Sequence, residues 1–224
     1  MLFYKRKAWL VLTIFLFTFS TKGIAESQAP LKNPKVEAQL SEKKWKIIDG
    51  FRSAKFGMDE KQVLRAIRKD FKVTKKNVKQ KISIQKSKIL TITIPKLMAL
   101  GGTADIVYIL GYKSKKLVQV NIDWGAGVTK IFDKDDVLNA ANFLRRHFMN
   151  NRYKKKGLLL NKKRKDGTTI VFRGRDKQDR MILLKLKNPF INEGKKKKPS
   201  GNISLILSYV VDPKKPDIFR ATLK

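Results

Sequence analysis

Two stretches of the chain repeat apolar residues every three or four positions, which is the spacing of an amphipathic helix. The first stripe consists of Val63, Leu64, Ile67 and Phe71. Asp59 precedes it as an N-cap, and Gln62 is placed to reach back to the backbone of that cap. Met58 and Val63 supply a hydrophobic staple around the cap, and Gly57 allows a sharp turn before it. We therefore predict a helix that begins directly after Asp59.

The second stripe follows a local repeat of the first. "FDKDDVLNA" at 132–140 aligns without a gap with "MDEKQVLRA" at 58–66. Asp133 then takes the place of the cap and Asp136 that of the glutamine. The apolar side consists of Val137, Leu138, Ala141, Leu144 and Phe148. This pattern predicts a second helix that runs to about Asn150.

Between and after the helices, apolar and polar residues alternate with a period of two, which is typical of strands with one dry and one wet face. We predict strands near 81–86, 89–94, 104–112 and 117–124, then near 158–161, 168–173, 181–187 and 203–210. Short polar linkers between neighbouring runs favour antiparallel hairpins. The predicted fold is α+β: two tandem helix-then-antiparallel-meander units, each helix packed on one face of its sheet. Whether the two units share one sheet stays open.

The N-terminus has the pattern of a signal peptide. Three basic residues at 5–7 precede an apolar run at 8–19, and small residues at Gly23 and Ala25 fit cleavage after Ala25. The apolar run is shorter than the ~20 residues of a membrane span, and an uncleaved anchor is the alternative. We expect a signal peptide at 1–25, a flexible leader at 26–44, a first α+β unit at 45–130 and a second at 131–224.

Composition narrows the setting. The 224 residues contain no cysteine and carry a formal net charge of +34, which becomes +30 once the four basic residues of the signal peptide are removed. Small extracellular eukaryotic domains usually rely on disulfides, so we predict a bacterial protein that is periplasmic or secreted. A hydrophobic fraction of 42% is high enough to build a folded core.

The stretch "GFRSAKFGMDEKQVLRAIRKDF" resembles the start of a group of uncharacterised exported bacterial proteins that carry Phe-Arg-Ser-Ala-Lys-Phe-Gly-Met before a helix. The Gly-Met-acid-x-x-Val entry to the helix also resembles the β-lactamase-inhibitor-protein and small outer-membrane-lipoprotein group, which implies helices packed on an antiparallel sheet. This chain lacks the lipobox cysteine of those lipoproteins. Neither resemblance brings functional residues with it.

Candidate chemistry is sparse. His147 is the only histidine, and no serine and aspartate partners for a triad can be identified. "DKDD" at 133–136 lacks the glycine and final glutamate of a calcium loop, and "GAGVTK" at 125–130 lacks the ending of a phosphate loop. We therefore predict no catalytic residue, no metal site and no cofactor. The alternative function is a cell-wall-acting hydrolase in which two of Asp105, Asp123 and Asp176 converge in one cleft.

The strongest remaining signal is positive charge, which attracts polyanions at close approach. Lysine and arginine crowd the segments "KKKGLLLNKKRK" at 154–165 and "GKKKKPSG" at 194–201. The candidate residues for an anionic partner are Arg52, Lys55, Arg173, Arg175, Arg180, Lys195 and Lys196. We predict a non-enzymatic envelope protein that binds another envelope protein or an anionic lipid or glycan surface, with nucleic acid disfavoured. A general lysine bias of the source organism is the alternative explanation of the charge.

Overall fold

The computed structural model describes residues 43–193 and 196–220. The expected signal peptide, nearly all of the expected leader and Lys195 lie outside the described residues. Among the described residues, the α-helices are α2 (Glu60–Phe71) and α3 (Lys134–Met149). The strands are β1 (Gly50–Phe51), β2 (Ala54–Lys55), β3 (Lys79–Ile82), β4 (Lys88–Ile94), β5 (Ala104–Leu110), β6 (Leu117–Gly125), β7 (Leu159–Lys163), β8 (Thr168–Arg175), β9 (Met181–Lys187), β10 (Phe190–Glu193), β11 (Lys196–Pro199) and β12 (Ser204–Val210).

Both helices begin where the sequence predicts. The Asp59 carboxylate accepts from the Gln62 backbone N–H at 2.9 Å, and the Gln62 side-chain oxygen accepts from the Asp59 N–H at 2.9 Å, which completes the capping box. At α3, Asp133 accepts from two backbone N–H groups of the first turn. Asp136 does not reach back to this cap. Its carboxylate accepts instead from the Gly101 N–H at 2.8 Å, which ties α3 to the loop after β4.

Eight strands form one antiparallel sheet in the order β3-β4-β5-β6-β12-β9-β8-β7. β12, the last of the described strands in the sequence, lies between β6 and β9 in the middle of the sheet. The two halves of the chain are therefore joined in one continuous sheet and do not form two separate ones. This sheet and the two helices together make an α+β fold, as the sequence patterns predict.

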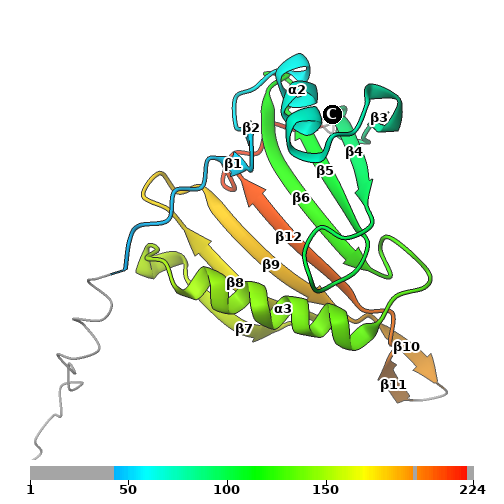
Figure 1. Ribbon diagram of the computed structural model, residues 1–224. Helices are drawn as coiled ribbons and strands as arrows, with labels where there is room; N and C mark the ends of the chain where they lie inside the picture. Colours follow the sequence, from blue (N-terminus) through cyan, green and yellow to red (C-terminus); the bar gives the residue numbers. More distant parts are fainter. Residues whose placement is uncertain (1–42, 194–195, 221–224) are drawn as a thin grey trace, which may run out of the picture.

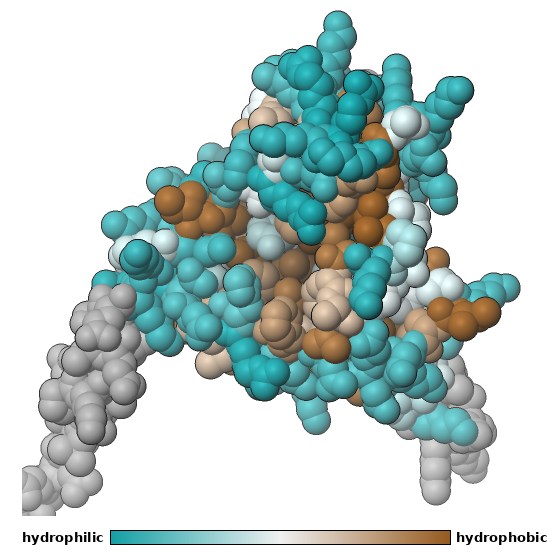
Figure 2. Space-filling model, viewed as in Figure 1, coloured by the Kyte–Doolittle hydropathy of each residue, from teal (hydrophilic) through white to brown (hydrophobic). Residues whose placement is uncertain are grey.

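The two helices lie on the same face of the sheet (Figure 1). α3 crosses β6, β12, β9 and β8 and so spans the middle of the sheet. Between helices and sheet lies one hydrophobic core, to which α2 contributes Val63 and Ile67, α3 contributes Val137 and Phe148, and β6 contributes Trp124. Figure 2 shows hydrophilic side chains on the outer surfaces of the helices and apolar surface gathered in the space between them.

Two short hairpins escape the alternating pattern. β1 pairs with β2 around Arg52, whose φ of 50° gives the tight turn, and this hairpin lies beside α2. β10 pairs with β11, and this separate hairpin connects β9 to β12 along the chain. The expected strand at 104–112 ends at Leu110, because Gly111 and Tyr112 belong to the turn before β6. Within the described ranges, neither helix is long and apolar enough to cross a membrane.

Candidate functional site

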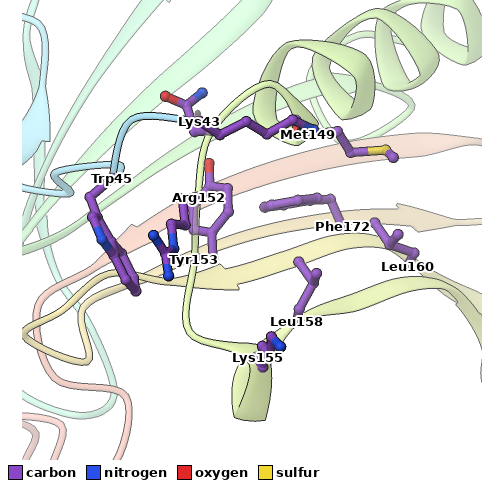
Figure 3. A pocket seen from close by; sticks show the side chains of 10 residues that line it. Lys43, Trp45, Met149, Arg152, Tyr153, Lys155, Leu158, Leu160 and Phe172 are labelled. Atoms are coloured by element: carbon purple, nitrogen blue, oxygen red, sulfur yellow. Dashed lines mark hydrogen bonds between the residues drawn. The ribbon is translucent and has the colours of Figure 1, made fainter. Parts of the chain in front are cut away.

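A cavity of about 550 Å³ lies where the C-terminal end of α3 meets the outer strands β7 and β8. This volume falls within the ~300–1,000 Å³ usual for ligand pockets. It is lined by Lys43, Trp45, Met149, Asn151, Arg152, Tyr153, Lys155, Leu158, Leu160 and Phe172. Figure 3 shows Phe172, Leu158, Leu160 and Met149 around one side of this space, with Trp45 and Arg152 side by side at the other.

The cavity exists because α3 ends before it covers the edge of the sheet. The floor is Phe172, which is fully buried. The centre of its ring lies 5.4 Å from the centre of the Phe148 ring and 5.1 Å from that of Tyr153. The outer wall comes from Leu158, directly before the edge strand β7, and from Leu160 within it, which remain 42% and 41% exposed. Apolar side chains so exposed at the border of a cavity mark a surface that is incompletely covered in this chain.

A strap of residues 43–48 closes the second side of the cavity. Its backbone pairs with the segment after α3: the Lys46 N–H donates to the Arg152 carbonyl at 3.1 Å, and the Arg152 N–H donates to the Lys44 carbonyl at 2.9 Å. The strap is fixed further on, where the Ile48 N–H donates to the buried carboxylate of Asp176 at 3.1 Å. These bonds hold Trp45 at the mouth of the cavity.

Cations gather at this mouth. The guanidinium of Arg152 lies 4.8 Å from the centre of the Trp45 ring and the ammonium of Lys177 lies 5.1 Å from it, which are cation–π distances. Lys43 donates to the Met149 carbonyl at 2.9 Å. Among the described residues, no carboxylate forms an ion pair with Lys43, Arg152 or Lys155. The cavity therefore combines apolar walls with positive charge that the described part of the chain does not neutralise.

One polar group inside this apolar site lacks a partner. The Tyr153 hydroxyl is buried and makes no hydrogen bond among the described residues. Burial, with a smaller contribution from Tyr209, raises the pKa of Tyr153, so its hydroxyl stays protonated and able to donate. An unpaired buried donor costs free energy, and this hydroxyl presents no accessible surface to the cavity.

The predicted anion-binding residues do not converge on this cavity. Arg52 stacks on the Phe71 ring at 4.7 Å, and Lys55 pairs with Asp49 at 3.1 Å, both at the β1–β2 hairpin. Arg180 pairs with buried Asp176 at 2.7 Å. Lys196 belongs to the β10–β11 hairpin through its backbone. Four of the seven residues are thus spread over three hairpins.

Two further candidates, Arg173 and Arg175, lie on β8 and point to the sheet face opposite the helices. The Arg173 Nε donates to the Gly157 carbonyl at 3.0 Å, and the aliphatic part of Arg175 packs against the same glycine. Their charges therefore lie near the rim formed by the 155–160 segment without lining the cavity.

Sequence reasoning missed the cavity because its walls come from four separate segments. One signal was present: Leu158 and Leu160 belong to a run of three leucines inside a strongly basic segment. Consecutive leucines on a short edge strand leave at least one apolar side chain on each face, and one of these faces lies beyond the reach of α3.

The three candidate carboxylates separate into two places. Asp105 and Asp123 are direct cross-strand partners on β5 and β6. Burial and the charge of Asp105 raise the pKa of Asp123 to about 6. Asp176 is fully buried in the turn between β8 and β9, where Arg180 and backbone N–H groups occupy its oxygens.

The chain matches no protein-family model, no curated protein and no solved structure.

Proposed function

We propose that this protein is an exported, non-enzymatic, basic protein of the bacterial envelope that binds an anionic lipid. The cavity takes an acyl chain, and the cations at its mouth bind the headgroup. The observation that carries the proposal is the meeting of exposed leucines, a 550 Å³ apolar cavity and unneutralised cations in one place. Apolar walls with a few well-placed polar groups are the usual composition of a small-molecule site.

Each part of the site suits one part of such a lipid. Phe172, Leu160 and Met149 offer an apolar path between the end of α3 and β7. Arg152 and Lys155 lie at its border, where a phosphate or carboxylate would keep partial contact with water. A guanidinium binds these anions with two parallel N–H donors.

Trp45 provides a direct test, because contact with a brominated acyl chain quenches tryptophan fluorescence. After cleavage following Ala25 the chain retains two tryptophans, Trp45 and Trp124, and Trp124 is 1% exposed in the core. Titration with a dibrominated fatty acid should therefore quench Trp45 in a saturable manner. Leu160→Lys should raise the Kd at least about tenfold, because a charge in the apolar wall costs more than ~1.4 kcal/mol.

Ile82→Lys is the matched control. Ile82 is 64% exposed at the end of β3, the opposite edge strand, so this variant adds the same charge away from the cavity. Equal binding of anionic vesicles by both variants, without quenching of Trp45, would show surface electrostatics alone and refute a lipid cavity. Capture of an envelope protein without any lipid binding would favour the protein-partner alternative instead.

A second candidate function is supported by the adjacency of Asp105 and Asp123, the two carboxylates of a cell-wall-acting hydrolase. Their cross-strand pairing and the raised pKa of Asp123 fit an acid and a base in one site. Release of soluble glycan from purified cell wall, abolished by Asp123→Asn, would support this function. No release by the folded chain would exclude it.

We also propose that the chain consists of two tandem units. Each helix is followed by a 3₁₀ turn and then by strands that fill one half of the sheet, β3 to β6 and then β7, β8, β9 and β12. Ile131, 90% exposed, lies between the halves. Separately expressed fragments 26–130 and 131–224 should recombine into a folded complex with native near-ultraviolet circular dichroism. Fragments that each remain unfolded when mixed would contradict this division.

A further inference from the structure

The face of the sheet opposite the helices carries its own pattern of side chains. Successive residues of a strand point to opposite faces, so this open face is built from alternate residues of each strand, and the pairing register arranges them in rows. The three rows, read from β4 to β8, are Thr93-Asp105-Asp123-Ile206-Lys185-Ile170, then Thr91-Val107-Asn121-Ser208-Leu183-Arg173, then Ile89-Ile109-Gln119-Val210-Met181-Arg175. Both described helices lie on the other face.

The open face has an apolar centre. Val107 and Ile109 on β5 are half-buried, as are Leu183 and Met181 on β9. Val210 on the central strand is only 9% exposed. Apolar side chains so arranged on a broad, pleated surface are typical of one layer of a sheet-on-sheet packing.

Acidic and basic side chains lie on opposite halves of this face. Asp105 and Asp123 lie on the β5–β6 side, and the Asp105 carboxylate accepts from the Thr93 hydroxyl at 2.6 Å. Lys185 lies in the same row on β9, on the other side of the central strand, with Lys187 next along its strand. One Asp123 oxygen is buried without a hydrogen-bond partner among the described residues. The face therefore offers acid on one half and base on the other.

We propose that two copies of this chain pair through their open faces, around a two-fold axis that runs parallel to the strands between β6 and β12. This axis places β5 of one copy over β9 of the other and β6 over β12. Asp105 then faces Lys185, Val107 faces Leu183, and Ile109 faces Met181. Asn121 faces Ser208 in the same way, whereas Asp123 comes to face Ile206 and Gln119 to face Val210.

The symmetry explains why a strongly basic chain would still self-associate. An isologous interface requires one patch to be complementary to itself, and Asp105 and Lys185 satisfy this because they lie at equal distances on the two sides of the axis. The positive charge elsewhere repels between the two copies, and added salt screens this repulsion, so added salt should strengthen the dimer.

A charge swap tests the pairing. Asp105 and Lys185 are separated by three strand spacings in one chain, about 14 Å, so they form no pair within a copy. Asp105→Lys and Lys185→Asp should each raise the dimer Kd at least about tenfold in sedimentation equilibrium, because each places like charges face to face. The double variant Asp105→Lys/Lys185→Asp should restore the wild-type Kd within about threefold, since opposite charges meet again across the axis.

Lys61→Asp is the matched control, because it makes the same charge change as Lys185→Asp on exposed α2, away from the open face. It should leave the Kd unchanged, and circular dichroism should show that all variants are folded. A wild-type chain that stays monomeric at the highest soluble concentration in high salt would overturn the proposal. So would a dimer that ignores the single swaps, or a double variant that fails to recover. The cavity lies on the helix side, so lipid binding should be the same in all four variants.

Discussion

The turn between β8 and β9 makes the sharpest stability prediction, because it buries a charge. Asp176 is fully buried, and its carboxylate accepts from the Arg180 Nε at 2.7 Å and the Arg180 N–H at 3.0 Å. It also accepts from the N–H groups of Gln178 at 2.9 Å and Ile48 at 3.1 Å. This carboxylate therefore holds its own turn and also fastens the strap that closes the cavity.

Asp176→Ala removes one partner of a buried ion pair, a change that costs ~3–5 kcal/mol in proteins. The Arg180 side chain keeps 20% of its surface exposed, so water can solvate its charge in part and the lower end of that range applies. We expect the free energy of unfolding to fall by about 3 kcal/mol, a large share of the ~5–15 kcal/mol that stabilises a typical domain.

Urea unfolding followed by circular dichroism gives the free energy directly, and an unchanged m-value would show that the same surface unfolds. Asp212→Ala is the control. Asp212 is exposed, and its carboxylate accepts from the Lys214 and Lys215 N–H groups in a surface turn. Its loss should lower the free energy of unfolding by at most ~0.5–1 kcal/mol. The double variant Asp176→Ala/Arg180→Ala should cost less than the two single changes added together. A loss below about 1 kcal/mol for Asp176→Ala would refute the reasoning.

Three further changes test other parts of the fold. Gly174→Ala should destabilise the chain by about 1–3 kcal/mol in the same urea assay, because an added Cβ would lie 2.6 Å from the Tyr153 ring; Gly127→Ala, where the nearest atom is 3.5 Å away, should be nearly neutral. Asp123→Asn should raise the free energy of unfolding by about 1–2 kcal/mol above pH ~7 and leave it unchanged near pH ~4. The reason is that the raised pKa of Asp123 makes the native wild-type protein lose stability as the pH rises through about 6. An effect that does not depend on pH would contradict this. Asp133→Ala should cost about 1 kcal/mol through the lost N-cap of α3, and Asn at this position, a good cap itself, should restore most of it.

Local signals predicted the elements well. The cap at Asp59 and the stripe from Val63 to Phe71 are contacts within a few residues, so the sequence contains everything needed to predict where α2 begins. Most strands of the large sheet also follow from their period of two, but β3 is Lys79–Ile82 where we predicted a strand at 81–86, and its four residues are all exposed and show no alternation. The β10–β11 hairpin has no such alternation, and β1 and β2 have only two residues each, too few for any period to show.

Contacts between residues far apart in the sequence could not be predicted. Nothing near Asp105 indicates that Asp123 lies directly opposite, because this pairing depends on the register across the turn after Leu110. Likewise, Trp45 and Leu160 are separated by more than a hundred positions and meet only through the end of α3. Asp176 shows the same limit: the sequence offers it as a candidate acid, whereas in the fold its oxygens are occupied by Arg180 and backbone donors.

The place of β12 in the sheet sets the order in which the molecule can be completed. Residues 204–210 are synthesised after every other described strand, and among the described strands they alone pair with both β6 and β9. Until they arrive, both edges present unpaired N–H and C=O groups that invite pairing with other chains. A chain terminated before Ser204 would carry almost every other element of the fold and still consist of two open sheets prone to aggregation.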